Sequence, residues 1–166
     1  LWMAKLSIPA LKITRHNGTD FPGTLALKLC PDFLKYVGRP KTIIAVTGTN
    51  GKTTVSNLLA DTLEKAGHRV LINRAGSNVA SGIATALLKG CGLAGLEVDE
   101  RSSVRVYPYI TPDYIAVTNL FRDSIMRNAH ADFIADIISR SVPAASKLVL
   151  NADDLISCGL APENPR

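Results

Sequence analysis

Residues 47–54 read Thr-Gly-Thr-Asn-Gly-Lys-Thr-Thr and carry the clearest chemistry in the chain. Glycines at 48 and 51 let backbone N–H groups approach phosphate oxygens, and the start of a helix adds unpaired N–H donors. Lys52 would neutralise the terminal phosphates of a nucleotide, and the Thr53 hydroxyl would bind Mg²⁺. The loop is shorter than the common phosphate-binding loop, because Val46 stands where that motif has its first glycine. The alternative is an ordinary turn before a helix. The predicted nucleotide-binding residues of the loop are Gly48, Thr49, Asn50, Gly51, Lys52, Thr53 and Thr54.

Acidic side chains follow a second apolar run, where the sequence reads Glu97-Val98-Asp99-Glu100. A carboxylate at the end of a strand can hold the Mg²⁺ that bridges nucleotide phosphates. We therefore expect Glu97 to be a metal ligand with Thr53, and Glu97 and Lys52 to be the catalytic pair. The alternative is a solvated strand end.

Amide, acidic and basic side chains follow the remaining strand candidates. Asn78, Asn119, Arg122 and Asp123 are predicted to position phosphate or substrate. The alternative for Asn119 and Asp123 is helix capping. Asn151 and Asp154 are predicted to contact the nucleotide, and a plain Asx turn is the equal alternative around Asn151.

Apolar runs and helix-length stretches alternate from residue 41 onward. This alternation favours an α/β fold, with a doubly wound, mostly parallel sheet and helices on both faces. The carboxyl ends of parallel strands share one edge, so the polar segments above should meet in one crevice. The expected strands are 43–46, 70–72, 95–98, 114–117 and 147–150, and the expected helices are 52–66, 78–89, 101–107 and 131–141.

The segment before this alternation has a different character. Residues 1–41 hold seven Lys and Arg against two Asp, a local balance of +5. The whole chain also has a net charge of +5, so the remaining residues balance to zero. We expect a basic leader over 1–40, with a turn at 21–23 and a helix over 24–37 interrupted at Pro31. An ATP-binding domain is expected over 41–160 and a loop or truncation point over 161–166. The leader could lie on an anionic membrane or simply be a solvated surface.

Composition excludes several classes of protein. No run approaches the roughly 18 apolar residues of a membrane span, and the first residues are a poor signal peptide. The three cysteines share no paired spacing, which fits a reducing compartment. Basic residues are spread out without an aromatic cluster, which disfavours nucleic-acid binding. We expect a cytoplasmic protein, peripheral at the inner face of the plasma membrane.

Taken together, these motifs resemble the Mur ligase superfamily, whose members join an amine to a carboxylate at the expense of ATP. The combination of the loop with Glu-Val-Asp-Glu at 97–100 and Thr-Asn-Leu-Phe-Arg-Asp at 118–123 is most similar to its MurT-type branch, subunits of lipid II isoglutaminyl synthase. The resemblance implies ATP and Mg²⁺ as cofactors and a glutaminase (GatD-type) partner subunit. It implies amidation of the D-glutamate α-carboxylate in the lipid II stem peptide to D-isoglutamine. By the resemblance, this step of peptidoglycan synthesis would pass through an acyl-phosphate intermediate, and ammonia derived from glutamine would supply the nitrogen.

The chain departs from the family pattern after Asp123. Ser124 stands at the metal-facing position and Met126 at the following acid, which leaves Thr53 and Glu97 as the safer ligands. The family's C-terminal ligase domain and four-cysteine zinc ribbon are absent, so we expect a fragment that binds ATP without completing the reaction. Two alternatives stay open, a folylpolyglutamate-synthase-like ligase and a non-catalytic nucleotide-binding protein.

Overall fold

A parallel sheet organises the chain in the computed structural model, which describes residues 20–73, 77–90, 92–121 and 131–160. The strands of the described residues are β1 (Thr42–Thr47), β2 (Val70–Ile72), β3 (Leu93–Glu97), β4 (Tyr114–Val117) and β5 (Lys147–Leu150). Their order across the sheet is β2-β3-β1-β4-β5, and every pairing is parallel. The chain therefore passes from one side of β1 to the other between β3 and β4, which is the position where such sheets bind ligands.

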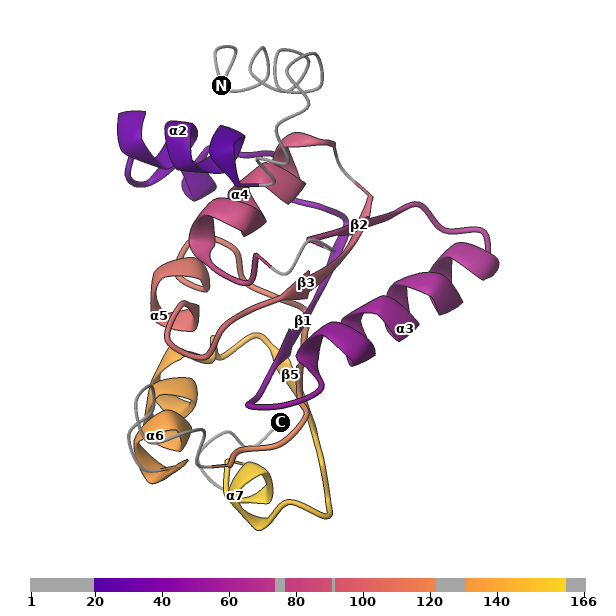
Figure 1. The fold of residues 1–166 in the computed structure, drawn as a ribbon, viewed down its shortest axis with the longest axis vertical. Coiled ribbons are helices and arrows are strands. Elements are labelled where there is room, and N and C mark those ends of the chain that lie inside the picture. The colour runs from indigo at the N-terminus through magenta and orange to yellow at the C-terminus, as the bar shows by residue number, and fades with distance from the viewer. Residues whose placement is uncertain (1–19, 74–76, 91, 122–130, 161–166) are drawn as a thin grey trace.

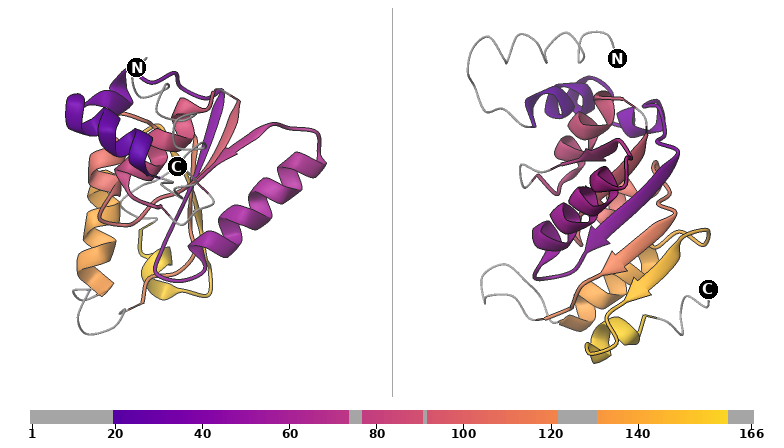
Figure 2. Two further views of the ribbon diagram at one scale, coloured as in Figure 1. Left: turned by 45° about the horizontal axis from the view of Figure 1, so that its top comes forward. Right: turned by 90° about the vertical axis from the view of Figure 1, so that its right-hand side faces the viewer.

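Helices cover both faces of this sheet, as the sequence predicts (Figures 1 and 2). Helix α3 (Lys52–Lys65) packs on one face against β1, β2 and β3. The opposite face carries α4 (Ala80–Leu88), α5 (Ser103–Val106) and α6 (Ala131–Ser141). The described chain also contains α2 (Phe21–Leu29), the 3-10 helix η1 (Phe33–Lys35) and α7 (Leu155–Cys158).

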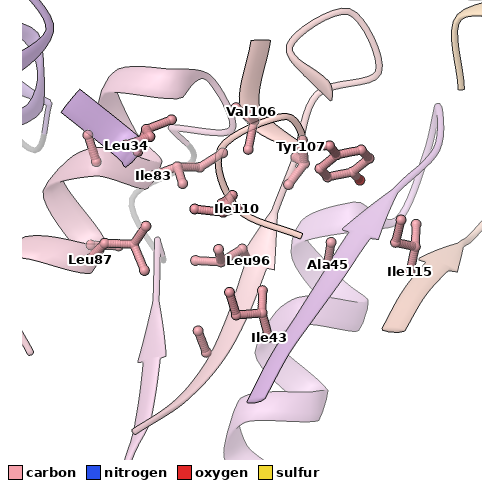
Figure 3. Packing of buried hydrophobic residues seen from close by; sticks show 14 of the residues in the cluster. Leu34, Ile43, Ala45, Ile83, Leu87, Leu96, Val106, Tyr107, Ile110 and Ile115 are labelled. Carbon is pink, nitrogen blue, oxygen red and sulfur yellow. The ribbon is translucent and has the colours of Figure 1, made fainter. Parts of the chain in front are cut away.

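The main hydrophobic core lies between the sheet and the helices of the α4 side (Figure 3). Parallel register places Ala45 of β1 beside Leu96 of β3 and Ile115 of β4, and all three side chains are fully buried. Successive residues of a strand face opposite sides, so Val46 and Glu97 point to the α3 side instead. β1, the strand that leads into the glycine loop, is thus held by buried neighbours on both edges.

The segment before β1 packs onto the domain instead of standing apart from it. Ala26 of α2 and Phe33 and Leu34 of η1 belong to the same buried cluster as the sheet residues. Helix α2 lies against α4, where the Gly23 N–H donates to Thr85 Oγ1 at 2.8 Å. The division into a leader and a domain at residue 40 stays a prediction, and the described part of the leader shares one core with the domain.

Element boundaries largely follow the predicted ones, except for one wrong turn and one helix that was not predicted. The turn predicted at 21–23 is wrong, because these residues form the first turn of α2. Pro22 is tolerated there since the first helical N–H groups have no intrahelical partner. The interruption after Leu29 is real, and the chain resumes as η1. Helix α7 was not predicted, because its four residues show no periodicity.

None of the described helices has the length and apolar character needed to span a bilayer.

The contact between α2 and α4 predicts a sharp dependence on residue 23. A Cβ built on Gly23 would lie 1.8 Å from the Ser81 carbonyl oxygen. We expect Gly23→Ala to lower the free energy of unfolding by about 1–3 kcal/mol through overpacking, measured by urea denaturation. Gly38→Ala is the control, because a Cβ there has no atom within 4 Å. Equal stability of the two variants would contradict the packing described here.

Candidate functional site

The glycine loop after β1 has the backbone geometry that a phosphate-binding turn requires. Gly48 has a φ of +123° and Gly51 a φ of +79°, values that favour glycine. A Cβ on Gly48 would also lie 2.3 Å from Thr118 Oγ1, so the loop approaches β4 closely. Gly51 is the N-cap of α3 and supplies no side-chain cap, which leaves the N–H groups of the first turn without that partner. Uncapped N–H groups at a helix start favour an anion.

Lys52 points back over this loop. Its Nζ donates to the carbonyl oxygens of Gly48 and, at 3.2 Å, of Thr49. It also forms an ion pair with Glu100, 3.1 Å from Nζ to Oε1, and both side chains are nearly buried. The cation predicted to grip phosphate is thus held beside the loop by two carbonyls and one carboxylate.

Glu100 is a site residue that the sequence reasoning did not select. In the sequence, Glu100 stands out only as the last residue of the acidic run 97–100, and its spacing does not mark it as the partner of Lys52. Burial raises the pKa of Glu100 above its ordinary value, while a backbone N–H and the Lys52 ammonium partly oppose the shift. A buried acid with a shifted pKa that pairs with a lysine marks a candidate functional site.

Glu97 lies at the end of β3 with its carboxylate against the start of α3. Thr53 Oγ1 donates to Glu97 Oε2 at 2.9 Å, and Asn78 Nδ2 donates to Oε1 at 3.4 Å. Glu97 is only 5% exposed, so few other groups can reach it. The structure thus brings together three residues predicted from separate segments.

The oxygen pair of Thr53 and Glu97 fits Mg²⁺, which binds one or two protein oxygens and completes its shell with water and phosphate. Across the described residues, no three His, Cys, Asp or Glu side chains group as a ready metal site. The protein would therefore contribute part of the coordination shell, and the phosphates of a nucleotide would contribute another part.

Asn73 was also missed as a functional residue, and it fixes the backbone at Glu97. Its Oδ1 accepts the Glu97 N–H at 2.9 Å, and its Nδ2 donates to the Glu97 and Ser77 carbonyls at 2.8 Å. The signal available in the sequence was a polar residue directly after a strand. Asn73 joins the end of β2 to the end of β3 and so holds the backbone of Glu97 in place.

Asn119 and Thr118 brace the loop from the other side. Asn119 Oδ1 accepts the Asn50 N–H at 2.9 Å, and Asn119 Nδ2 donates to the Asn50 carbonyl at 3.1 Å. Thr118 Oγ1 donates to the same carbonyl at 2.7 Å. Both polar atoms of the Asn119 side chain thus hold the loop, and its direct role towards phosphate stays a prediction.

Asn151 and Asp154 connect the end of β5 to the end of β4. Asn151 Nδ2 donates to the Thr118 carbonyl at 2.9 Å, and its Oδ1 accepts the Asp153 N–H at 3.0 Å, which is the Asx turn considered as the alternative. Asp154 is buried, accepts the Leu120 N–H at 2.6 Å and caps α7 through Ile156. Contact of either residue with a nucleotide stays a prediction, since these bonds give both a structural role.

Arg122 and Asp123 lie outside the described residues. The same holds for Ser124 and Met126, which carried the predicted departures from the family pattern.

Comparison with known proteins agrees with this geometry. Residues 46–161 match the model of the Mur ligase middle domain. The chain is 37% identical over 158 residues to the lipid II isoglutaminyl synthase (glutamine-hydrolyzing) subunit MurT of Staphylococcus aureus (strain COL), covering 92% of this chain and 36% of that protein. It is 38% identical over 147 residues to the same subunit of Streptococcus pneumoniae (strain ATCC BAA-255 / R6), covering 82% and 32%.

Solved structures show the same fold. The crystal structure of MurF from Acinetobacter baumannii superposes with a TM-score of 0.68 at 20% identity, over 84% of this chain and 33% of that one. The chain spans about a third of the length of the curated relatives it matches. The match to the family model covers the loop, the acidic strand end and the polar ends of β4 and β5, and the chain belongs to the Mur ligase family through its middle domain.

Proposed function

We propose that this chain is the nucleotide-binding part of an ATP-dependent amide ligase. One observation carries the proposal: Thr53 Oγ1 and Glu97 Oε2 lie 2.9 Å apart next to Lys52, at a helix start without a side-chain cap. Hydroxyl, carboxylate, ammonium and helix N–H groups are what Mg²⁺ and a triphosphate need together. The phosphates would bind over residues 48–54.

The reaction we propose is amidation of the D-glutamate α-carboxylate in the lipid II stem peptide. A carboxylate oxygen attacks the terminal phosphorus of ATP, and the bond from that phosphorus to the bridging oxygen breaks. ADP leaves, and the substrate carboxylate has become an acyl phosphate. Ammonia then attacks the carbonyl carbon, the carbon–oxygen bond to phosphate breaks, and the nitrogen loses a proton to give D-isoglutamine. Similarity to the MurT subunits supports this choice of substrate.

The residues of this chain would bind and align the phosphates. Lys52 would move its hydrogen bonds from the carbonyls of Gly48 and Thr49 to phosphate oxygens. The loop N–H groups would donate hydrogen bonds to the phosphate oxygens that gain negative charge during the reaction. Thr53 and Glu97 would hold Mg²⁺, which supplies charge neutralisation at the phosphates. Asn73 and Asn119 would keep the two sides of this cradle fixed.

The remaining parts of the proposal concern the whole protein. Ammonia would come from glutamine through a glutaminase partner of the GatD type, in line with the glutamine-hydrolyzing name of the relatives. The protein would act in the cytoplasm at the inner face of the plasma membrane, where lipid II is accessible. The test combines the full-length protein, the glutaminase subunit, lipid II vesicles, glutamine and Mg·ATP, and follows conversion of carboxylate to amide by mass spectrometry. ATP binding without any amidation would favour the non-catalytic alternative.

Lys52→Ala should weaken binding of Mg·ATP at least about tenfold, because a hydrogen bond to a charged group contributes about 1.5–3 kcal/mol. Isothermal titration calorimetry measures the affinity directly. Lys65→Ala, at the exposed far end of the same helix, is the control and should bind as the unmodified chain does. Unchanged affinity of the Lys52 variant would remove the basis of the proposed function.

Thr53→Val should abolish the gain in ATP affinity that Mg²⁺ provides, since the variant keeps the shape of the side chain and loses its oxygen. Thr53→Ser keeps the hydroxyl and should retain most of that gain. Titrating ATP with and without Mg²⁺ separates the two variants. An equal Mg²⁺ effect in both would show that the Thr53 oxygen is not a ligand.

Glu100→Gln should change how stability depends on pH. The pKa of Glu100 is higher in the folded chain than its ordinary value, so the folded state binds the extra proton more tightly than the unfolded state. The free energy of unfolding should therefore fall as pH rises from the ordinary glutamate pKa through the raised one. This fall should be smaller in Glu100→Gln than in the exposed control Asp153→Asn, measured by urea denaturation at a series of pH values. Identical pH slopes would contradict the burial described for Glu100.

A further inference from the structure

A cavity of about 450 Å³ lies at the amino ends of β1, β2 and β3. This is the edge of the sheet opposite the glycine loop, since all strands run parallel and the loop follows the carboxyl end of β1 (Figure 1). Its volume is within the range of about 300–1,000 Å³ that is usual for small-molecule pockets. The residues that line it are Lys41, Thr42, Gly67, His68, Arg69, Gly92 and Leu93.

The charge of this cavity is of one sign. Lys41, His68 and Arg69 are all exposed at its wall, and among the residues that the structure describes no carboxylate lines it. Within the described residues, none of these three side chains has an ion-pair partner, whereas nearby Arg39 is paired with Asp113 at 3.1 Å. The positive charges of Lys41 and Arg69 on one concave surface repel each other, and an anion between them relieves that repulsion.

The backbone around the cavity is already hydrogen-bonded within the protein. The Lys41 N–H donates to the Gly92 carbonyl at 2.8 Å, and the Leu93 N–H donates to the Arg69 carbonyl at 3.3 Å. The turn that carries His68 is fixed by Gly67, with a φ of +87°, and by the His68 N–H donating to the Leu63 carbonyl at 3.0 Å. The walls are therefore set by the fold, and recognition of a ligand falls to the basic side chains.

The chemistry of these side chains fits a phosphate group. The Arg69 guanidinium can bind two phosphate oxygens at once, and lysine adds a compact positive charge beside it. We propose that the cavity of Lys41, His68 and Arg69 is a second anion site that binds a phosphate group. It is separate from the nucleotide site and does not depend on the proposed ligase activity. The phosphate can belong to a free phosphorylated molecule or to a phospholipid headgroup at a membrane surface.

The experiment uses the full chain and two probes. Inorganic phosphate is titrated while NMR follows the His68 imidazole, whose signal is identified with a His68→Gln variant. Vesicles of phosphatidylglycerol, with phosphatidylcholine as the neutral comparison, are tested by co-sedimentation. Arg69→Gln is the test variant, and Lys28→Gln on the exposed side of α2 is the control with the same change of charge.

We expect Arg69→Gln to weaken binding about tenfold in at least one arm, as loss of a charged hydrogen bond does, and Lys28→Gln to change it less than twofold. Arg69-dependent binding of phosphate alone identifies a free phosphorylated ligand, and Arg69-dependent binding of phosphatidylglycerol vesicles identifies a headgroup. Absence of binding in both arms, or binding that Arg69→Gln leaves unchanged, overturns the proposal. Mg·ATP affinity should be equal in Arg69→Gln and the unmodified chain, which separates this site from the one at Lys52.

Discussion

Parallel pairing of β1 with β3 on one side and β4 on the other is the constraint on which the site depends. It places the end of β1 between two neighbouring strand ends, so the loop over residues 48–51 is flanked on both sides. Glu97 and Glu100 approach from the β3 side, and Thr118 and Asn119 approach from the β4 side. A loop on an edge strand would have lacked one of these two sets of partners.

The polar groups of the site also hold one another in the described chain. The ammonium of Lys52 is shared between a carboxylate and two loop carbonyls, and the hydroxyl of Thr53 donates to Glu97. Burying a single charge without a partner costs several kcal/mol, which makes such mutual pairing a condition for folding around a charged site. The phosphate binding proposed for this site would be an exchange of partners among groups that are already close, so it would need little reorganisation.

The fold and much of the site were predictable because they depend on local pattern. Runs of apolar residues separated by amphipathic stretches indicated the α/β class, and β2, β4, β5 and α6 have the predicted bounds. The role of the glycines, lysine and threonines of the loop could be predicted because they are consecutive in the sequence and their order alone indicates phosphate binding. The turn predicted at 21–23 was wrong because Phe-Pro-Gly is compatible with both a turn and a helix start, and packing of α2 on α4 decides between them.

The sequence by itself determined the chemical groups of the site, since the glycine loop, its lysine and its threonine lie within eight consecutive residues. Only the tertiary structure decided which distant residues meet them. Glu100 pairs with Lys52 across 48 positions, Asn73 fixes Glu97 across 24, and Asn119 braces Asn50 across 69. The gathering of Lys41, His68 and Arg69 into one cavity was equally invisible in the sequence. Such contacts depend on strand order and register, and the pattern of any single segment contains neither.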